Sequence, residues 1–324
     1  MEGIMYLFKY ILKRIALMLL TFFIIITICF VLVKLLPNLP AEQFGKDMEL
    51  IMKRRELLGY DLPIIQQFGR FLKYAFQGNF GVGETYRQGA EVWQIFIGRL
   101  PYTVVLNLAT IILSIPVGLL LGIYAALKKN KWQDHLISTG VMVIVSVPSF
   151  IYAFLIQYVL YFQLGWAPAI ADVSNGAWSW TFIKSAYPAI LSMAFGTIAG
   201  FARYTRAELT EVLTSEFMLL ARTKGLTKGQ ATIRHAMRNA MVPIFPMILG
   251  EFIAIMSGSL IIEQIFTIPG VGELYIGSIN AQPAPDYNFF MLLTVFYTFI
   301  NLAAGIIIDI SYGIIDPRIR MGAK

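Results

Sequence analysis

The sequence has little charge, almost no cysteine and almost no histidine for its length. Only 14% of its 324 residues are Asp, Glu, Lys or Arg, whereas soluble domains carry about a quarter. The single cysteine, Cys29, lies inside an apolar run, which excludes a disulfide framework and a cysteine-based metal site. Two histidines, His135 and His235, are too few for a histidine-rich metal site. Low charge together with 57% hydrophobic residues favours a multi-pass membrane protein.

Motifs for catalysis and nucleotide binding are also missing. The chain has no H-E-x-x-H, no G-x-S-x-G and no pair of intramembrane aspartates, so we expect no enzymatic activity. It lacks G-x-x-x-x-G-K-[ST], and the glycine-rich turn at 78–83 does not end in Lys-Ser/Thr. We therefore expect no metal or cofactor on this chain. Carboxylate or histidine relays are scarce and no internal repeat is evident, so energy for any transport should come from another subunit.

Long apolar runs predict six membrane-spanning helices in an all-α polytopic fold. Crossing about 30 Å of hydrocarbon takes roughly 20 apolar residues. The first run is predicted to be a retained span rather than a signal peptide, because Ile15–Val33 is unbroken and no A-x-A site follows. The six predicted spans lie near residues 11–36, 100–127, 136–163, 185–206, 242–265 and 288–312.

Basic residues predict that both termini are cytoplasmic. Most of the 26 Lys and Arg residues fall in short segments on one side if the N-terminus is inside. The net charge of +7 is therefore attributed to topology, and no nucleic-acid partner is expected. The predicted organisation is an N-terminal helix (1–36), a small external subdomain (37–98), a five-helix core (99–312) that includes a cytoplasmic loop (207–240), and a cytoplasmic tail (313–324).

A charged amphipathic segment interrupts the apolar pattern between residues 207 and 240. Gly225, preceded by the cation Lys224, predicts the end of a first helix. Thr227 with Gln230 three residues later predicts a capping box that begins a second helix. The alternatives are a helix–glycine–helix elbow bound by another protein and a solvated surface helix. Apolar residues recur here at helical spacing, at Leu209, Val212, Leu213, Phe217 and Leu220.

Polar groups at membrane depth are few. Glu251 lies inside the fifth predicted span, and an intramembrane carboxylate is a functional candidate by default. It is expected either to line a watery pathway or to join a hydrogen-bonded helix contact. Asn107 and Gln157 are further pathway candidates, with hydrogen bonding between helices as the alternative.

Small residues and prolines predict how the spans pack. Gly118/Gly122 and Gly196/Gly200 are small-xxx-small pairs, which allow two helices to approach closely. Prolines remove a backbone donor and are expected to bend their helices. They lie in or at the edge of four successive predicted spans, at Pro116, Pro148, Pro188, Pro243 and Pro246.

Several of these segments together resemble a known family. The residues 219–225, 235–240 and Pro243 resemble the cytoplasmic "EAA" loop of ABC importer permeases, in the A-R-x-K-G-L…R-H-A-x-x-N-A…P version of the binding-protein-dependent peptide branch. Leu219 replaces the motif's Glu, so no ion pair of that Glu is carried over. The long segment after the first span resembles the B-type subunit of oligopeptide and dipeptide importers. Further matching segments are 77–81, 99–103, 262–266, 269–272 and 316–320.

The resemblance implies a fold, partners and a substrate. It implies a type I importer permease in a bacterial or archaeal cytoplasmic membrane, paired with a second related permease. Two cytoplasmic ABC ATPases would hold ATP and Mg²⁺, and an external binding protein would deliver oligopeptides or dipeptides. Alternatives are a nickel-chelate, glutathione or other peptide-like solute, and, outside the family, a stand-alone secondary carrier or channel. The implied ATPase-coupling residues are Ser215, Glu216, Phe217, Met218, Leu220, Ala221, Arg222, Lys224 and Gly225, with Phe217, Met218 and Leu220 as apolar anchors.

Overall fold

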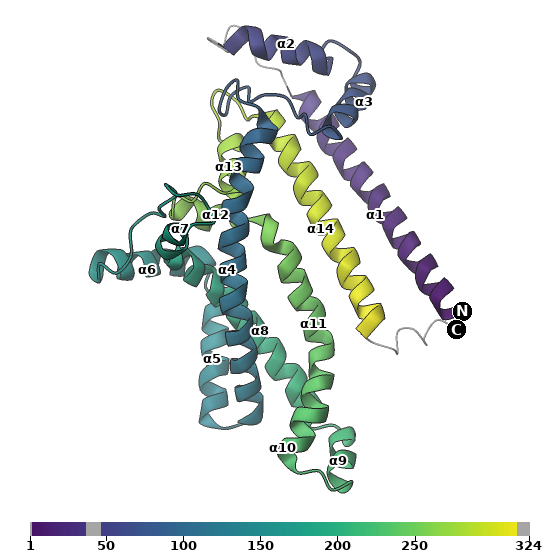
Figure 1. The fold of residues 1–324 in the computed structure, drawn as a ribbon, viewed down its shortest axis with the longest axis vertical. Coiled ribbons are helices and arrows are strands. Elements are labelled where there is room, and N and C mark those ends of the chain that lie inside the picture. The colour runs from purple at the N-terminus through teal and green to yellow at the C-terminus, as the bar shows by residue number, and fades with distance from the viewer. Residues whose placement is uncertain (1, 37–46, 316–324) are drawn as a thin grey trace. The chain divides into compact units, whose positions relative to one another are not determined.

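The computed structural model describes residues 2–36 and 47–315, which are almost entirely helical (Figure 1). Among these residues the only β-pairing is an isolated bridge between Val82 and Glu91, so the all-α prediction is confirmed for them. Part of the predicted external segment (37–46) and most of the predicted tail (316–324), with the matching segment 316–320, lie outside the described residues.

The helices follow one another with few long connections. Three irregular turns extend them: π-helical turns at Tyr158–Gln163 and Thr232–Ala236, and a 3₁₀ turn at Ala254–Ser257. In chain order the helices are α1 (Glu2–Leu35), α2 (Met48–Leu58), α3 (Ile64–Ala75), α4 (Val92–Leu127), α5 (Trp132–Ser146), α6 (Ser149–Gln157), α7 (Trp180–Ser185), α8 (Tyr187–Leu213), α9 (Glu216–Thr223), α10 (Lys228–Ala231), α11 (Met237–Ile253), α12 (Leu260–Ile265), α13 (Val271–Ile279) and α14 (Tyr287–Ile315).

The structure supports four or five of the six predicted spans. By length and composition, four helical segments of the described chain suffice to cross a membrane: Lys9–Leu35, Val92–Leu127, Lys228–Ser257 and Tyr287–Ser311. A fifth is added if the bent pair α5 and α6 counts as one crossing. The predicted span 185–206 does form a helix, α8, of 27 residues. It is not among the four, because tyrosine, glycine and arginine residues dilute its apolar content.

Two predicted spans have different ends or shapes from those expected. The span 136–163 is broken at Pro148, where the axes of the two helical segments differ by 99°. Val147 is extended there, as expected for a residue before proline, and Pro148 begins the next helix. The span 242–265 was predicted to begin and end too late, because the helical crossing runs over Lys228–Ser257, α11 ends at Ile253, and α12 forms a separate helix. Pro188, expected to bend a span, instead lies in the first turn of α8, where proline is tolerated.

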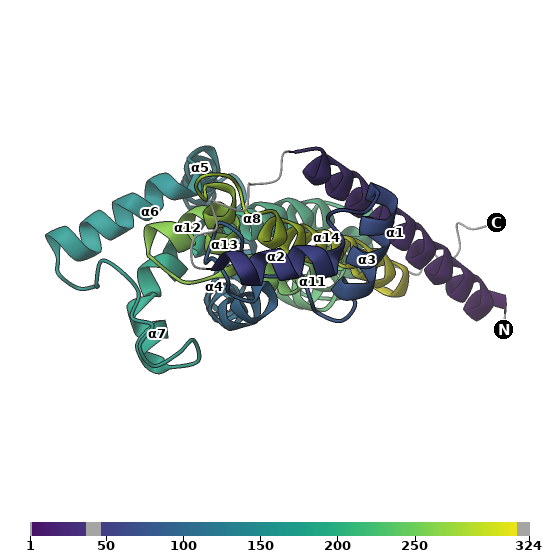
Figure 2. The ribbon, with the colours of Figure 1, turned by 90° about the horizontal axis from the view of Figure 1, so that it is seen from above.

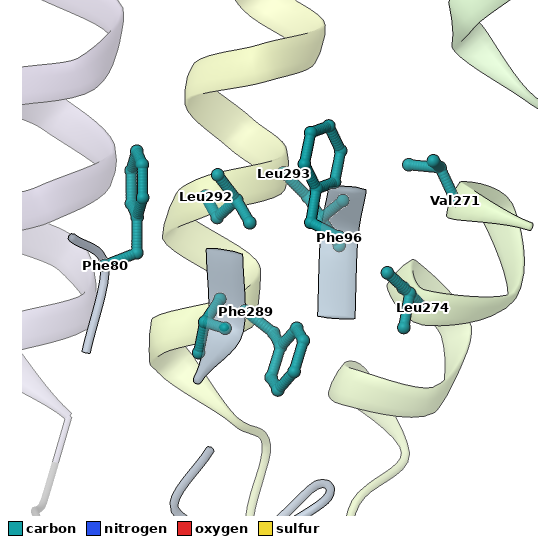
Figure 3. Packing of buried hydrophobic residues seen from close by; sticks show 8 residues of the cluster. Phe80, Phe96, Val271, Leu274, Phe289, Leu292 and Leu293 are labelled. Atoms are coloured by element: carbon teal, nitrogen blue, oxygen red, sulfur yellow. The ribbon is translucent and has the colours of Figure 1, made fainter. Parts of the chain in front are cut away.

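The described residues form two compact units, whose boundaries fall within α4 and α14 and between α11 and α12. The first unit comprises residues 1–104 and 256–306. Its core gathers side chains from the 80–96 segment, α13 and α14, as Figure 3 shows. Aromatic rings pack edge to face there, including Phe96 against Phe296 with centroids 4.8 Å apart. The core residues are Phe80, Val92, Phe96, Val271, Leu274, Phe289, Leu292 and Leu293.

A buried carboxylate connects the segment before α4 to the start of α14. Asp286 Oδ2 accepts hydrogen bonds from the backbone amides of residues 84, 85 and 86, at 2.6, 2.9 and 3.0 Å. Its Oδ1 accepts the amides of Asn288 and Phe289, both at 3.2 Å, and so caps α14. Burial raises the pKa of Asp286, although these amide hydrogen bonds oppose the rise. The same segment is fixed to α2 by Arg55, whose Nε donates to Glu84 at 3.0 Å.

The second unit comprises residues 105–255 and 307–324, and α8 packs against α5, α6 and α11 within it. One of the two predicted glycine pairs lies at a close helix contact. A Cβ on Gly118 would lie 2.7 Å from Phe201 Cβ, and one on Gly122 would lie 2.6 Å from Thr205 Cβ, so α4 and α8 touch through both glycines. The pair Gly196/Gly200 does not serve this purpose among the described residues. A Cβ on Gly200 would meet nothing within 4 Å.

Candidate functional site

The amphipathic segment folds as a short helix, α9, between two sharp turns, and Figure 1 shows α9 and α10 at the end of α8 and α11. The helix α8 ends at Leu213, so Leu209, Val212 and Leu213 belong to a different helix from Phe217 and Leu220. Hydroxyl groups terminate α8: Ser215 Oγ donates to the Val212 carbonyl at 2.7 Å, and Thr214 Oγ1 to the Thr210 carbonyl at 3.0 Å. Ser215 therefore shapes the turn, because its hydroxyl is directed back to α8.

The second turn has the predicted geometry. Lys224 is the C-cap of α9, and Gly225 follows with φ +87°, in the left-handed region that glycine adopts without strain. Gly225 donates its amide to the Arg222 carbonyl at 3.0 Å. Thr227 and Gln230 form the predicted capping box, with Gln230 N donating to Thr227 Oγ1 at 3.3 Å and Thr227 N to Gln230 Oε1 at 3.2 Å. Both ends of the elbow are thus fixed by local hydrogen bonds.

One face of α9 packs into the protein. Met218 is 4% exposed and Ala221 is also buried, whereas both were expected to contact a partner. Because these side chains lie inside the chain's own core, we assign them to supporting α9 rather than to contacting another protein. The cluster joins residues of five segments: Ala126, Leu209, Met218, Ala221, Ala231, Ala236 and Ala240.

The opposite face of α9 is apolar and exposed. Phe217 is 44%, Leu219 63% and Leu220 55% exposed, and Arg222 and Lys224 are exposed beside them. We call Phe217, Leu219, Leu220, Arg222 and Lys224 the outer face of α9. Glu216, which is also exposed, lies in the first turn, where its charge is favourable to the helix dipole.

Two exposed apolar residues near this site were missed from the sequence. Leu219 was considered only as a replacement of the motif Glu, and Ile233, which is also exposed, was not considered. The signal for Leu219 is the unbroken apolar run 217–221. Five consecutive residues point to all sides of a helix, so when one side is buried some of these apolar side chains must remain exposed. Phe217 also packs edge to face against His235, with ring centroids 5.7 Å apart.

A partly buried ion pair connects α5 and α8, the helices that precede the elbow. Arg206 of α8 forms a bidentate pair with Asp134 of α5, and its Nη2 lies 2.8 Å from Asp134 Oδ2. Asp134 also accepts the amide of Asn130 at 2.9 Å and the hydroxyl of Ser138 at 3.2 Å. Neither residue was predicted as a site residue, and Arg206 counted only among the basic residues that predict topology. Their pairing requires residues 72 positions apart to meet, which no local pattern indicates.

The three predicted pathway residues do not form one site. Asn107 donates to the Ile255 carbonyl at 2.9 Å, just after α11, and Gln157 donates to the Ala169 carbonyl at 2.6 Å. Glu251 is half-buried on α11. The hydrogen bond of Asn107 agrees with the alternative of bonding between helices, whereas that of Gln157 goes to a loop carbonyl, which neither alternative included. A pathway role for these residues stays a prediction.

A buried carboxylate site around Glu263 was not predicted from the sequence. Glu263 of α12 is fully buried, and its Oε2 accepts the amides of Gly272 and Glu273 at 2.8 and 3.2 Å, at the first turn of α13. Its Oε1 accepts the hydroxyl of Thr103 at 2.8 Å, and Thr103 Oγ1 accepts the amide of Val271 at 2.8 Å. The first three amides of α13 thus find acceptors, which a buried helix end requires.

This contact explains the glycines that follow Glu263 in the sequence. A Cβ on Gly270 or Gly272 would collide with the Glu263 carboxylate, and Gly258, at φ +63°, approaches it equally closely. The segments 262–266, 269–272 and 99–103 were noticed only as separate matches to a family. The structure shows that they meet at one buried carboxylate.

Comparison with known proteins gives matches along nearly the whole chain. The family described as "Binding-protein-dependent transport system inner membrane component" matches residues 118–321, and its N-terminal counterpart matches residues 7–107. The dipeptide transport system permease protein DppB of Lactococcus lactis is 33% identical, covering 97% of this chain and 99% of its own. Bacillus subtilis DppB is 32% identical (98% and 99%), and the glutathione transport system permease protein GsiC of Escherichia coli K12 is 31% identical (96% and 99%).

Proposed function

This chain belongs to the family of inner-membrane components of binding-protein-dependent transport systems, and we propose that it is the B-type permease of an ATP-driven peptide importer. As a permease it is a non-catalytic, multi-pass membrane component of a transporter. The observation that carries the proposal is the outer face of α9. It is an exposed apolar surface, held rigidly on a chain that has no nucleotide-binding motif of its own.

In the proposed mechanism, α9 is the coupling helix. Phe217, Leu219 and Leu220 would insert into a cleft of a cytoplasmic ABC ATPase, with Arg222 and Lys224 at the charged rim of the contact. ATP binding would bring two ATPases together and displace α9. Because Met218 and Ala221 fix α9 to the core around Leu209, this displacement would be transmitted to α8 and the helices packed on it.

The proposed assembly contains a second related permease, two ATPases that hold ATP and Mg²⁺, and an external binding protein. Both termini and the α9–α10 elbow would be cytoplasmic, as the distribution of Lys and Arg predicts. The α2–α3 segment would then lie on the external side of the membrane, where a binding protein delivers the solute.

The coupling assignment is tested by placing a charge on the outer face of α9. We expect Leu220→Asp and Phe217→Asp to abolish ATPase co-purification and transport, because a carboxylate cannot be buried unpaired in an apolar cleft. The matched control is Ile170→Asp, at an equally exposed apolar position in the loop between α6 and α7. Membrane insertion, measured by yield and monodispersity, should be unchanged in all three. Wild-type transport by Leu220→Asp would refute the assignment.

The substrate is tested with the reconstituted complex and its external binding protein. The similarity to two dipeptide permeases favours peptides, and the similarity to a glutathione permease makes glutathione the second candidate. We expect a labelled dipeptide to accumulate in proteoliposomes only with ATP, and excess unlabelled dipeptide to block it. Competition by glutathione but not by dipeptides would favour the second candidate. Uptake by this chain alone without ATP would instead identify a secondary carrier or channel.

A further inference from the structure

The helix α3 packs on α1 at the depth of a membrane span. The rings of Phe68 and Phe71 lie 5.2 Å from the ring of Phe30, and Phe68 also lies 5.7 Å from Phe23. Both partner rings belong to the apolar span Lys9–Leu35. Figures 1 and 2 agree that α3 lies alongside the C-terminal part of α1. The face of α3 that carries Phe68 and Phe71 therefore contacts the apolar, membrane-spanning part of α1.

The part of α1 beside this contact exposes apolar side chains. Ile24, Ile28 and Leu32 are each about half exposed, as expected of a span that faces lipid. A helix attached to α1 at the same level must meet the same surroundings. At about 100° per residue these three side chains lie on the side of α1 away from Phe30, so they mark the depth at which α1 meets lipid, and exposed side chains of α3 at that depth meet lipid as well.

A second apolar stripe on α3 has no partner within the described chain. Ile65 is 84% and Phe76 is 91% exposed. At about 100° per residue, Ile65, Leu72 and Phe76 fall within roughly 40° of one another around the helix axis, next to the face that carries Phe68. An isolated exposed leucine or phenylalanine is ordinary, but two of the most exposed apolar side chains on one line of a helix are not.

The polar side of α3 has the charge that suits a lipid surface. Lys73 and Gln66 lie about 80 to 100° from the exposed stripe, on the side away from Phe68. The helix contains Arg70 and Lys73 and no acidic residue. Arg70 is engaged by the end of α2, where its Nη1 donates to the Leu57 carbonyl at 3.1 Å. Lys73 is exposed on the other side and suits a lipid phosphate.

We propose that α3 is an interfacial helix that inserts Ile65 and Phe76 into the lipid leaflet at the C-terminal end of α1. Phe68 and Phe71 fix it to the span, the stripe enters the acyl region, and Lys73 remains at the headgroups. The lipid contact depends only on α1 crossing the membrane. Its assignment to the outer leaflet rests on the orientation given in the proposed function.

The experiment uses the complete transporter complex in lipid nanodiscs. In a Cys29→Ser background, an environment-sensitive fluorophore is attached at Ile65→Cys or Phe76→Cys. The controls are Gln66→Cys, the adjacent residue on the polar side, and Glu49→Cys, exposed on α2. Only variants with the yield and size-exclusion profile of the wild type are used, so that a misfolded variant is excluded.

We expect blue-shifted emission at positions 65 and 76, with a loss of intensity when the lipids carry doxyl groups on the acyl chain. Positions 66 and 49 should instead be quenched by aqueous iodide. Iodide quenching at 65 and 76 equal to that at 49 would overturn the proposal. Protection at 65 and 76 that appears only on adding the external binding protein would also overturn it and would assign the stripe to protein docking. Failure of the complex to import peptide leaves these readings unaffected.

Discussion

Adding a methyl group to Gly118 or Gly122 should loosen the contact between α4 and α8. In each case the new Cβ would lie less than 3 Å from a Cβ and a carbonyl oxygen of α8: Phe201 Cβ at 2.7 Å and the Ile198 oxygen at 2.9 Å for Gly118. For Gly122 the corresponding atoms are Thr205 Cβ at 2.6 Å and the Ala202 oxygen at 2.7 Å. These atoms belong to the backbone or are attached to it, so no side-chain rotation relieves the collision.

The magnitude follows from two opposing effects. Overpacking of a well-filled contact costs about 1 to 3 kcal/mol. Alanine gains up to about 1 kcal/mol over glycine inside a helix. We therefore expect Gly118→Ala and Gly122→Ala each to destabilise the subunit, by about 1 to 2 kcal/mol, and the double variant to lose more than either. The helices separate as rigid bodies, so the two costs need not add.

The other glycine pair is the matched control, because it has the same sequence pattern in α8. Gly200→Ala meets no atom within 4 Å, and Gly196→Ala meets only the Tyr152 hydroxyl at 3.4 Å, an ordinary contact. Both should be neutral or slightly stabilising. The assay is the apparent melting temperature of the isolated subunit in mild detergent, followed by size-exclusion chromatography after heating. If Gly200→Ala lowers it more than Gly122→Ala, the assignment of the close contact is wrong.

Three further substitutions test the sites described above. Glu263→Ala leaves the amides of residues 272 and 273 and the Thr103 hydroxyl without their acceptor. Each buried donor left unpaired costs about 1 to 3 kcal/mol of stability. The melting temperature of Glu263→Ala should therefore fall more than that of Glu263→Gln, which keeps one acceptor oxygen. Asp134→Asn breaks the pair with Arg206 and should cost about 1 to 3 kcal/mol, less than the loss of a fully buried pair, because the Arg206 side chain is 33% exposed; recovery in Asp134→Asn/Arg206→Gln would confirm that the unpaired charge is the cause, and equal loss in the double variant would contradict it. Gly225→Ala should cost about 1 kcal/mol and reduce ATP-driven transport, because Gly225 has φ +87°, whereas Gly229→Ala, in helical α10 with open space around it, should retain wild-type uptake.

Local signals were predicted well from the sequence. The glycine stop at Gly225 and the capping box of Thr227 and Gln230 both depend on residues within four positions of each other, and both are present. The length of the apolar runs predicted the spans that contain α1, α4, α11 and α14, because a helix of roughly 20 apolar residues is long enough to cross the hydrocarbon core.

Features that depend on distant residues were not predictable in the same way. Two glycine pairs of equal spacing behave differently because only one of them faces a neighbouring helix. Met218 and Leu220 are both apolar and lie in the same short helix, yet only the orientation of α9 against α8 and α11 decides which is buried. The hydrogen bonds of Glu263 join α12 to Thr103 of α4, 160 residues earlier in the chain, and to the start of α13.

The way α9 is held would allow so short a helix to transmit a displacement in the proposed mechanism. Eight residues of isolated helix have little stability in water, because nucleation is unfavourable. Here the buried cluster that contains Met218 and Ala221 draws on α4, α8, α10 and α11, and interiors of this kind are close-packed and resist compression. The pair Asp134–Arg206 attaches α5 to the same α8. A force on the outer face of α9 therefore acts on a group of packed helices rather than on a flexible loop, which is the property that a coupling element requires.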